Sequence, residues 1–412
     1  PKFSRVVSRE EIRSNDYNLN IPRYVDSSEA AEHWDVYASM FGGIPTAEIE
    51  ELGEFWTAFP ALKKALFTES GIPYVNVSVD DIKSAIKSHP DVVGFEDAFN
   101  AAFSTFPAFL KEELIDRMES IEISKAETVL SADIFERLKD IPLIDKYAAF
   151  QLLDDDWTGI SIDLEVLQTE GFSATKEVDP NLVIKKKDGK DQEVQEGWVG
   201  HIIPFDLVQA TLLSAETDEL HGLESRLAEI PSEYESILDE MTEEDKESCN
   251  DVLTEEGDAF VPKEVSKKIK ELKKDRSPES VALRTLLEKV ESLVKSEKEI
   301  KAEIKAKSAA LQAKTKDTIE RLSDEQALDL LEKKWIAPLI ESIHKLPDTV
   351  IDSLVSKIQA LQNKYATTFF EVEQQISETE ATLSGMIDDL EGNEYDMLGL
   401  NELKKLLGGS AE

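Results

Sequence analysis

The sequence predicts a mainly α-helical, multi-helical protein with one small β-hairpin at about residues 181–203 and a C-terminal region of long helices forming a coiled coil or bundle. Three observations predict this fold class. Glycine (17) and proline (15) are sparse among 412 residues, which favours helices over turn-rich β architecture. The stretch 279–337 contains neither residue and places apolar side chains every three or four positions. Around 181–203, two extended runs flank Asp188-Gly189, a pair typical of a hairpin turn.

The N-terminal half is expected to begin irregularly and then to form short helices. Polar and turn-forming residues fill 14–24, and Gly42, Gly43 and Pro45 close an irregular segment of 45 residues. Thr46 has the character of a helix N-cap. Prolines separate the helices expected after it, which lie near 59–68, 80–88, 95–105, 107–121, 124–139, 143–153 and 160–169.

The C-terminal half is expected to be helical after the hairpin, from Phe205 to about Ile230 and then in longer pieces. Residues 348–384 lack Gly and Pro and carry an apolar stripe: Val350, Leu354, Ile358, Leu361, Tyr365, Thr368, Val372, Ile376, Thr379, Leu383 and Ile387. A second stripe runs from Leu283 to Leu311. A helix of about 36 residues spans about 54 Å, more than a compact domain needs. Part of each stripe is therefore expected to meet another subunit.

The charge distribution excludes some functions and suggests one contact. The net charge of −40 argues against a free-standing DNA-coating protein and against binding to an anionic membrane. Residues 214–258 hold 17 acids and 2 bases, whereas residues 263–317 hold 16 bases and 10 acids. The second block favours either a solvated helix face or phosphate contacts inside a larger complex. Its leading candidates are Lys263, Lys267, Lys268, Lys270, Lys273, Lys274 and Arg276.

The residues give no sign of a catalytic, cofactor-binding or metal-binding site. The five histidines lack metal-ligand spacing, and no phosphate-binding or nucleophile-elbow motif occurs. Asp154-Asp155-Asp156 is interpreted as a helix end followed by an N-cap rather than a cation site. Phe41-Gly42-Gly43 lacks the strand and helix of a cofactor loop, and 179–182 is interpreted as the turn before the hairpin. The single cysteine, Cys249, and the lack of a membrane-length apolar run indicate a cytoplasmic protein.

One segment resembles a known family. Residues 15–25, NDYNLNIPRYV, closely resemble a signature of the modification (methyltransferase) subunit of type I restriction–modification systems. Residues 193–205, with EVQEGWVG running on to IPF, and 364–368, KYATT, resemble the longer form of the same family. The signature residues are Asn15, Asp16, Tyr17, Asn18, Leu19, Asn20, Pro22, Arg23 and Tyr24.

The resemblance implies a function for the parent enzyme. Such a subunit binds S-adenosylmethionine and methylates adenine N6 in a site read by a specificity subunit, and a restriction subunit completes the complex. Its cofactor loop and Asn-Pro-Pro-aromatic motif do not occur here. With Pro1 in place of Met, we expect a C-terminal portion that lacks the catalytic domain, contains no cofactor and is inactive alone. DNA would be reached only through the complex.

The resemblance also implies an interface and a domain division. The C-terminal helices are expected to dock on the specificity subunit, or to pack only on the helix of 281–320. The residues concerned are Leu354, Ile358, Leu361, Tyr365, Phe369, Val372 and Ile376. The expected regions are a linker (1–45), a helical domain (46–178), a hairpin with acidic helices (179–260) and an assembly region (261–412). Exposed stripes would also permit self-association. An acidic DNA mimic and a coiled-coil scaffold are the alternatives.

Overall fold

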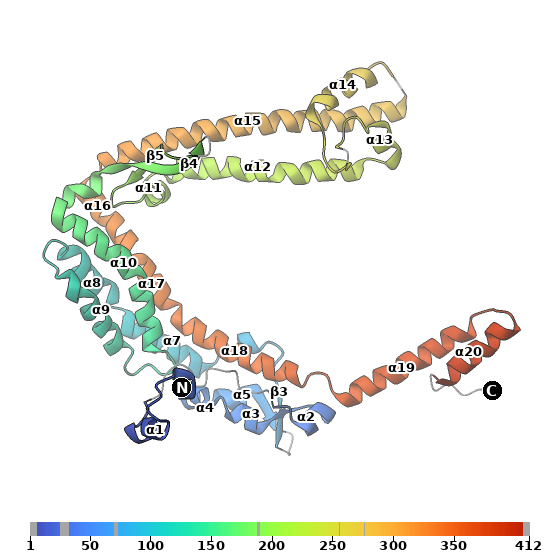
Figure 1. Ribbon diagram of the computed structural model, residues 1–412, viewed down its shortest axis with the longest axis horizontal. Helices are drawn as coiled ribbons and strands as arrows, with labels where there is room; N and C mark the ends of the chain where they lie inside the picture. Colours follow the sequence, from blue (N-terminus) through green and yellow to red (C-terminus); the bar gives the residue numbers. More distant parts are fainter. Residues whose placement is uncertain are drawn as a thin grey trace. The chain divides into compact units, whose positions relative to one another are not determined.

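The computed structural model describes residues 6–24, 33–69, 73–187, 190–254, 256–275 and 277–406 (Figure 1). It is mainly α-helical, as predicted, and contains two small antiparallel sheets. The chain forms two compact units, Pro1–Ala98 with Pro347–Glu412, and Phe99–Leu346. The expected boundary near residue 261 therefore falls inside the second unit. The spacing of an apolar stripe identifies one face of a helix. It does not identify which part of the chain covers that face.

The first unit combines short N-terminal elements with the C-terminal helices. Its N-terminal elements are α1 (Arg9–Ser14), η1 (Ile21–Arg23), α2 (Val36–Phe41), β1 (Ile44–Pro45), α3 (Thr46–Glu50), α4 (Gly53–Ala58), α5 (Leu62–Leu66), β2 (Phe67–Glu69), β3 (Tyr74–Val77) and α6 (Ile82–Lys87). Its C-terminal elements are α18 (Leu346–Lys364), α19 (Phe369–Asp388) and α20 (Glu394–Leu406). Strand β3 lies between β1 and β2 in a sheet that the sequence did not predict, because strands of two to four residues show no periodicity.

The N-terminal segment, which was expected to be irregular, contains two short helices that begin at side-chain caps. Ser8 Oγ accepts a hydrogen bond from the Glu11 N–H (3.2 Å) at the start of α1. Asp35 Oδ1 accepts one from the Ala38 N–H (2.8 Å) at the start of α2. Thr46 is not a cap, since it is the first residue of α3 and follows the N-cap Pro45.

The second unit has one large core. The chain enters it through α7 (Pro90–Phe103), and its elements are α8 (Phe106–Leu110), η2 (Lys111–Asp116), α9 (Ile123–Arg137), α10 (Lys146–Glu170), η3 (Phe172–Lys176), β4 (Val178–Lys187), β5 (Lys190–Gly200), α11 (Phe205–Leu212), α12 (Ser214–Glu240), α13 (Glu243–Ser248), α14 (Pro262–Leu272), α15 (Pro278–Glu320), α16 (Asp324–Leu331), η4 (Glu332–Ile336) and α17 (Ala337–His344). The main core is centred on phenylalanines of α7–α8, the apolar face of α10 and Trp335.

Helix α10 corrects two predictions at once. The two helices expected at 143–153 and 160–169 form a single helix of 25 residues that Asp145 caps. Asp154-Asp155-Asp156 lies inside this helix and is not a helix end with an N-cap. Leu153, Trp157 and Ile160 are buried on the same face, so the core holds the helix through the acidic run. Burial and the neighbouring Asp155 raise the pKa of Asp156.

A two-helix arm occupies the middle of the sequence. Helices α12 and α15 run side by side, with α13 and α14 at their far end (Figure 1). Helix α15 has 43 residues and is therefore about 65 Å long. The predicted hairpin is confirmed as β4 and β5, although its turn, Asp188-Gly189, lies outside the described residues.

Candidate docking surface

The long helix expected over 348–384 is interrupted, and the interruption is built from specific hydrogen bonds. Thr368 Oγ1 accepts a hydrogen bond from the Glu371 N–H (3.1 Å), and Glu371 accepts one from the Thr368 N–H (3.0 Å). This capping box starts α19 as a new helix. Periodicity alone predicted one helix because the apolar spacing continues across the break. The Thr-x-x-Glu pattern was the signal that could have found it.

A buried polar cluster joins the end of α18 to the N-terminal elements of its own unit. The Tyr365 hydroxyl donates to Glu48 Oε1 (2.5 Å) and accepts from the Asp35 N–H (3.1 Å). Lys364 Nζ donates to Glu48 Oε2 (2.9 Å) and to the His33 carbonyl (2.6 Å). Tyr365 is only 4% exposed, and its burial, followed by the Glu48 contact, raises its pKa. The cluster fixes where α19 leaves the unit.

The seven predicted interface residues divide into two groups. Leu354 and Ile358 are fully buried, Tyr365 is nearly so and Leu361 is half-buried, so these four belong to the interior of the first unit. Phe369, Val372 and Ile376 are 59%, 37% and 53% exposed. The stretches 348–384 and 281–320 belong to different units, and within its own unit α15 packs against α12 and α14.

Helix α19 carries a bare apolar face. Phe369, Val372, Ile376 and Leu383 are all exposed. At 100° per residue they fall within a sector of about 60°. We call these four residues the α19 apolar face. At its distal end α19 contacts α20, where Lys404 pairs with Asp388 (2.7 Å). An aligned row of exposed apolar side chains is typical of a protein–protein interface.

The N-terminal segment adds further exposed apolar side chains. Helix α2 contacts α19, and Val36 and Phe41 of α2 are 77% and 61% exposed. The signature segment folds on itself: Asn18 Oδ1 accepts a hydrogen bond from the Asn20 N–H (2.9 Å), and Arg13 Nε donates to the Tyr17 hydroxyl (3.2 Å). Its apolar members remain outside, namely Tyr17, Leu19 and Ile21.

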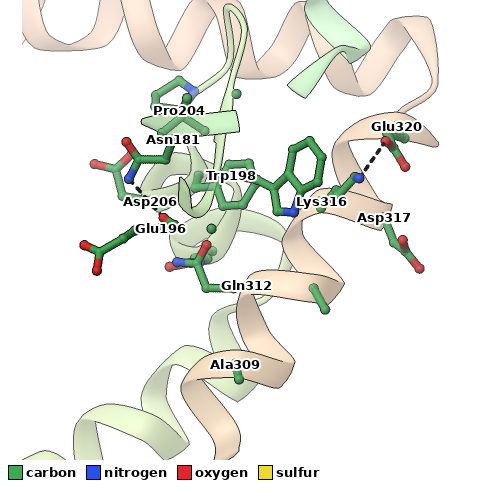
Figure 2. A pocket seen from close by; sticks show the side chains of 16 residues that line it. Asn181, Glu196, Trp198, Pro204, Asp206, Ala309, Gln312, Lys316, Asp317 and Glu320 are labelled. Atoms are coloured by element: carbon green, nitrogen blue, oxygen red, sulfur yellow. Dashed lines mark hydrogen bonds and ion pairs between the residues drawn. The ribbon is translucent and has the colours of Figure 1, made fainter. Parts of the chain in front are cut away.

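The second resembling stretch, 193–205, forms the edge of an open groove (Figure 2). Glu196 and Gly197 of β5 lie opposite a single residue of β4, Asn181. This two-to-one pairing is a β-bulge, and its Gly197 has a φ of +79°. A Cβ on Gly200 would lie 1.7 Å from the Ile203 carbonyl oxygen. Both glycines are therefore structural requirements.

The groove holds an aromatic contact and several carboxylates. Lys316 Nζ lies 3.5 Å from the centre of the Trp198 ring, which ties β5 to α15. Figure 2 shows Lys316 beside the indole, with the carboxylates of Glu196, Asp206 and Asp317 nearby. The cation–π contact already occupies one face of the ring, so the arrangement explains why the hairpin packs on α15.

The structure places Phe41-Gly42-Gly43 and residues 179–182 in a turn and in a strand. Gly42 and Gly43 have φ of +83° and +88° and make the turn between α2 and β1. Residues 179–182 lie within β4 and not in a turn before it, because the strand begins at Val178. Within the described residues, no group of three or more metal-binding side chains gathers, and no glycine-rich loop joins a strand to a helix in the way an S-adenosylmethionine site requires.

A histidine between two carboxylates stabilises the base of the hairpin. The ring nitrogens of His201 lie 2.6 Å from Asp179 Oδ2 and 3.1 Å from Glu170 Oε2. The hydrogen bond with Asp179 is the main cause of the raised pKa of His201. The contact joins α10 to β4, so its role is structural.

The basic block of the sequence divides between two helices. Lysines of α15 pair with carboxylates of α12: Lys289 with Glu240 (3.1 Å), Lys307 with Glu219, and Lys314 with Glu216. Three ion pairs therefore join the acidic and basic blocks along the antiparallel arm. Six of the seven predicted phosphate contacts lie on α14 or its closing turn, and the seventh, Arg276, lies outside the described residues.

Comparison with known proteins gives one result. Residues 1–33 match the N-6 DNA Methylase family. The N-terminal part of the chain, which includes the signature segment, is thus similar to N6 DNA methyltransferases. No curated protein and no solved structure matches the chain. None of the described helices has an apolar stretch sufficient to span a bilayer.

Proposed function

We propose that this chain is the assembly region of the modification subunit of a type I restriction–modification enzyme, and that α19 docks on helices of the specificity subunit. The α19 apolar face carries the proposal, since three of the seven residues expected at such an interface lie on it and are exposed. The match of residues 1–33 to N-6 DNA methylases supports the enzyme class.

The physical argument concerns the energy of a bare helix face. Full burial of a Val, Leu, Ile or Phe side chain contributes about 1.5–3 kcal/mol. Four such side chains in one row match the way an amphipathic helix enters an apolar groove or a helical bundle. The buried Tyr365 cluster anchors α18, so the first turn of α19 is held in place before a partner arrives. Such preorganisation lowers the entropy cost of docking.

In this proposal the 412 residues serve assembly. S-adenosylmethionine, recognition of the DNA sequence and the restriction subunit belong to the assembled enzyme, and none of the described residues is assigned to methyl transfer. A DNA mimic is less well supported, because Glu216, Glu219 and Glu240 are paired with lysines of the same chain. A mimic requires a uniformly acidic face.

Co-purification with the specificity subunit tests the proposal. The variant combines Val372→Asp and Ile376→Asp, and we expect it to lose the partner while keeping its circular dichroism spectrum. The matched control combines Val129→Asp and Ile162→Asp, at exposed positions of the second unit (46% and 56%). The control is expected to retain the partner. Retention by the α19 variant, or loss by both, would contradict docking through this face.

A further inference from the structure

Helix α14 presents a row of lysines directly away from the protein. Val265 and Ile269 are buried on one side of this helix. Lys263, Lys267, Lys270 and Lys274 are spaced by four, three and four residues and are all exposed. At 100° per residue the three on α14, Lys263, Lys267 and Lys270, fall within about 60° of one another, opposite the buried face, and Lys274 follows in the closing turn. We call these four residues the α14 lysine row.

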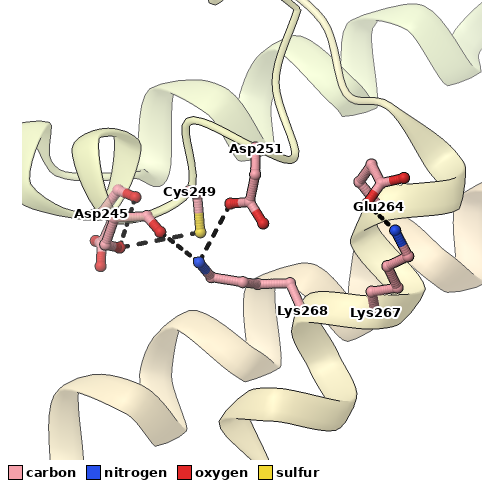
Figure 3. A network of polar contacts seen from close by, with 7 residues as sticks. Asp245, Cys249, Asp251, Glu264, Lys267 and Lys268 are labelled. Atoms are coloured by element: carbon pink, nitrogen blue, oxygen red, sulfur yellow. Dashed lines mark hydrogen bonds and ion pairs between the residues drawn. The ribbon is translucent and has the colours of Figure 1, made fainter.

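A neighbouring lysine on the same helix behaves differently. Lys268 points toward the loop after α13, where its Nζ donates to the Ser248 carbonyl (2.6 Å) and pairs with Asp251 (3.2 Å). Figure 3 shows this inward contact beside the buried Cys249, whereas Lys267 reaches only Glu264 of its own helix (2.8 Å). Lys268 therefore fixes α14 to the tip of the arm, and the row remains on the outside.

The row lies apart from the ion pairs that join α12 to α15. Within the described ranges, Lys263, Lys270, Lys273 and Lys274 make no ion pair, in contrast to the lysines of α15 that pair with α12. Glu264 and Glu271 lie beside the row on α14. The acidic helix α13 lies at the same end of the arm. A chain with a net charge of −40 thus places three exposed lysines that lack an ion pair among the described residues, Lys263, Lys270 and Lys274, at the end of a long arm, and Lys267 beside them is paired with Glu264.

We propose that the α14 lysine row binds the phosphate backbone of double-stranded DNA. The identity of the polyanion rests on the proposed function; the geometry of the row does not. From Lys263 to Lys270 the helical part of the row extends about 10 Å. That length matches about three phosphates of one strand at 3.4 Å each. Charges beyond about 10 Å are largely screened at 0.1 M salt, so the net charge of the chain does not decide binding at the tip.

The contact would position DNA without reading its sequence. Lysine is a flexible point charge, and phosphate contacts carry no direct base information. Each lysine that neutralises a phosphate contributes about 0.9 to the slope of log K against log salt. Loss of four such contacts should therefore lower that slope by about 3–4. A salt titration consequently measures the contact directly.

The experiment uses the full chain and a fluorescently labelled 30-base-pair duplex of arbitrary sequence, with anisotropy followed over a series of salt concentrations. The test variant combines Lys263→Gln, Lys267→Gln, Lys270→Gln and Lys274→Gln. The control combines Lys125→Gln, Lys139→Gln, Lys345→Gln and Lys405→Gln, which remove the same charge from exposed lysines elsewhere. We expect the test variant to bind at least about tenfold more weakly at 0.1 M salt and to lose about 3–4 of the slope. The control should stay within about twofold of the wild type.

Three results would overturn the inference: no binding by the wild-type chain, equal losses in both variants, or an unchanged slope in the test variant. Equal losses would mean that only net charge matters. The outcome is separate from that of the proposed function, because co-purification with the specificity subunit is measured without DNA. The test variant should co-purify as the wild type does. A wild-type chain that binds DNA through the row but never binds that subunit would contradict the proposed function alone.

Discussion

Helices α18 and α19 share one apolar period in the sequence, yet they have opposite surroundings. Leu354 and Ile358 of α18 are fully buried, whereas Val372 and Ile376 of α19 are 37% and 53% exposed. The side chains are of similar size and occur at the same spacing. The difference shows that periodicity identifies an apolar face without identifying what covers it.

The cause lies in what each helix contacts within its unit. Helix α18 is held against N-terminal helices by ion pairs from Lys83 to Asp352 (2.9 Å) and from Lys87 to Asp348 (2.7 Å). Lys357 also lies 5.0 Å from the ring centre of Phe55. The main contacts of helix α19 among the described residues are with two shorter helices, α2 and α20. One half of the stripe therefore stabilises the fold, and the other half is available for docking.

Truncation of a buried leucine of α18 should give the largest effect on the free energy of unfolding. A small effect would contradict the difference between α18 and α19. Leu354→Ala removes a fully buried side chain and leaves a cavity, so we expect a loss of about 2–5 kcal/mol in the free energy of unfolding. The matched change in α19, Ile376→Ala, should stay within about 0.5 kcal/mol. Urea unfolding measures both. Equal losses would mean that the two halves of the stripe are covered alike.

Removal of one hydroxyl should give the next largest effect. Tyr365→Phe leaves Glu48 Oε1 and the Asp35 N–H without their partner in a half-buried site, which costs about 1–3 kcal/mol. Tyr395→Phe serves as the control, because Tyr395 is 82% exposed. Urea unfolding should separate the two variants. Identical stabilities would show that the polar cluster does not hold the end of α18.

The sequence predicted elements better than it predicted their partners. The helical class and the β4–β5 hairpin follow from local signals, namely a period of 3.6 and an Asp-Gly turn. The split of 348–384 was missed because the capping box at Thr368 interrupts the helix without interrupting the apolar spacing. The joining of two expected helices into α10 was missed because the core overrides the acidic run at 154–156.

The candidate sites could be predicted only in part, for a related reason. Counting charges along the sequence identified a basic block at 263–317. The count could not distinguish lysines that pair with α12 from lysines that remain exposed. Lys307 and Lys270 are the same residue type within the same basic block, and the antiparallel register of α12 and α15 gives Lys307 a partner on the other helix, Glu219, in addition to Glu303 of its own helix. Likewise, the exposure of Phe369 depends on the absence of a covering element among the described residues, which no local pattern encodes.

Loss of the cap should affect α19 more modestly. Thr368→Ala removes the hydroxyl that accepts the Glu371 N–H, and loss of such a cap costs about 1 kcal/mol. We expect the helical circular dichroism signal to fall and docking to weaken, with α18 unaffected. Thr368→Ser retains the hydroxyl and should behave as the wild type. A wild-type signal from Thr368→Ala would mean that α19 starts without its cap.

The smallest expected effect is a pH dependence confined to the start of α19. The hydrogen bond from the Thr368 N–H is the main cause of the lowered pKa of Glu371. Because the pKa is lower in the folded protein, the stabilisation is complete above the ordinary value of 4.5 and disappears as the pH falls through the folded value. Glu371→Gln keeps an acceptor for the capping box but cannot titrate. The helical circular dichroism signals of wild type and Glu371→Gln should therefore match above pH 5. As the pH drops further, the signal of the wild type should fall below that of the variant. Parallel curves throughout would show that Glu371 does not cap the helix, and the start of α19 would then depend on Thr368 alone.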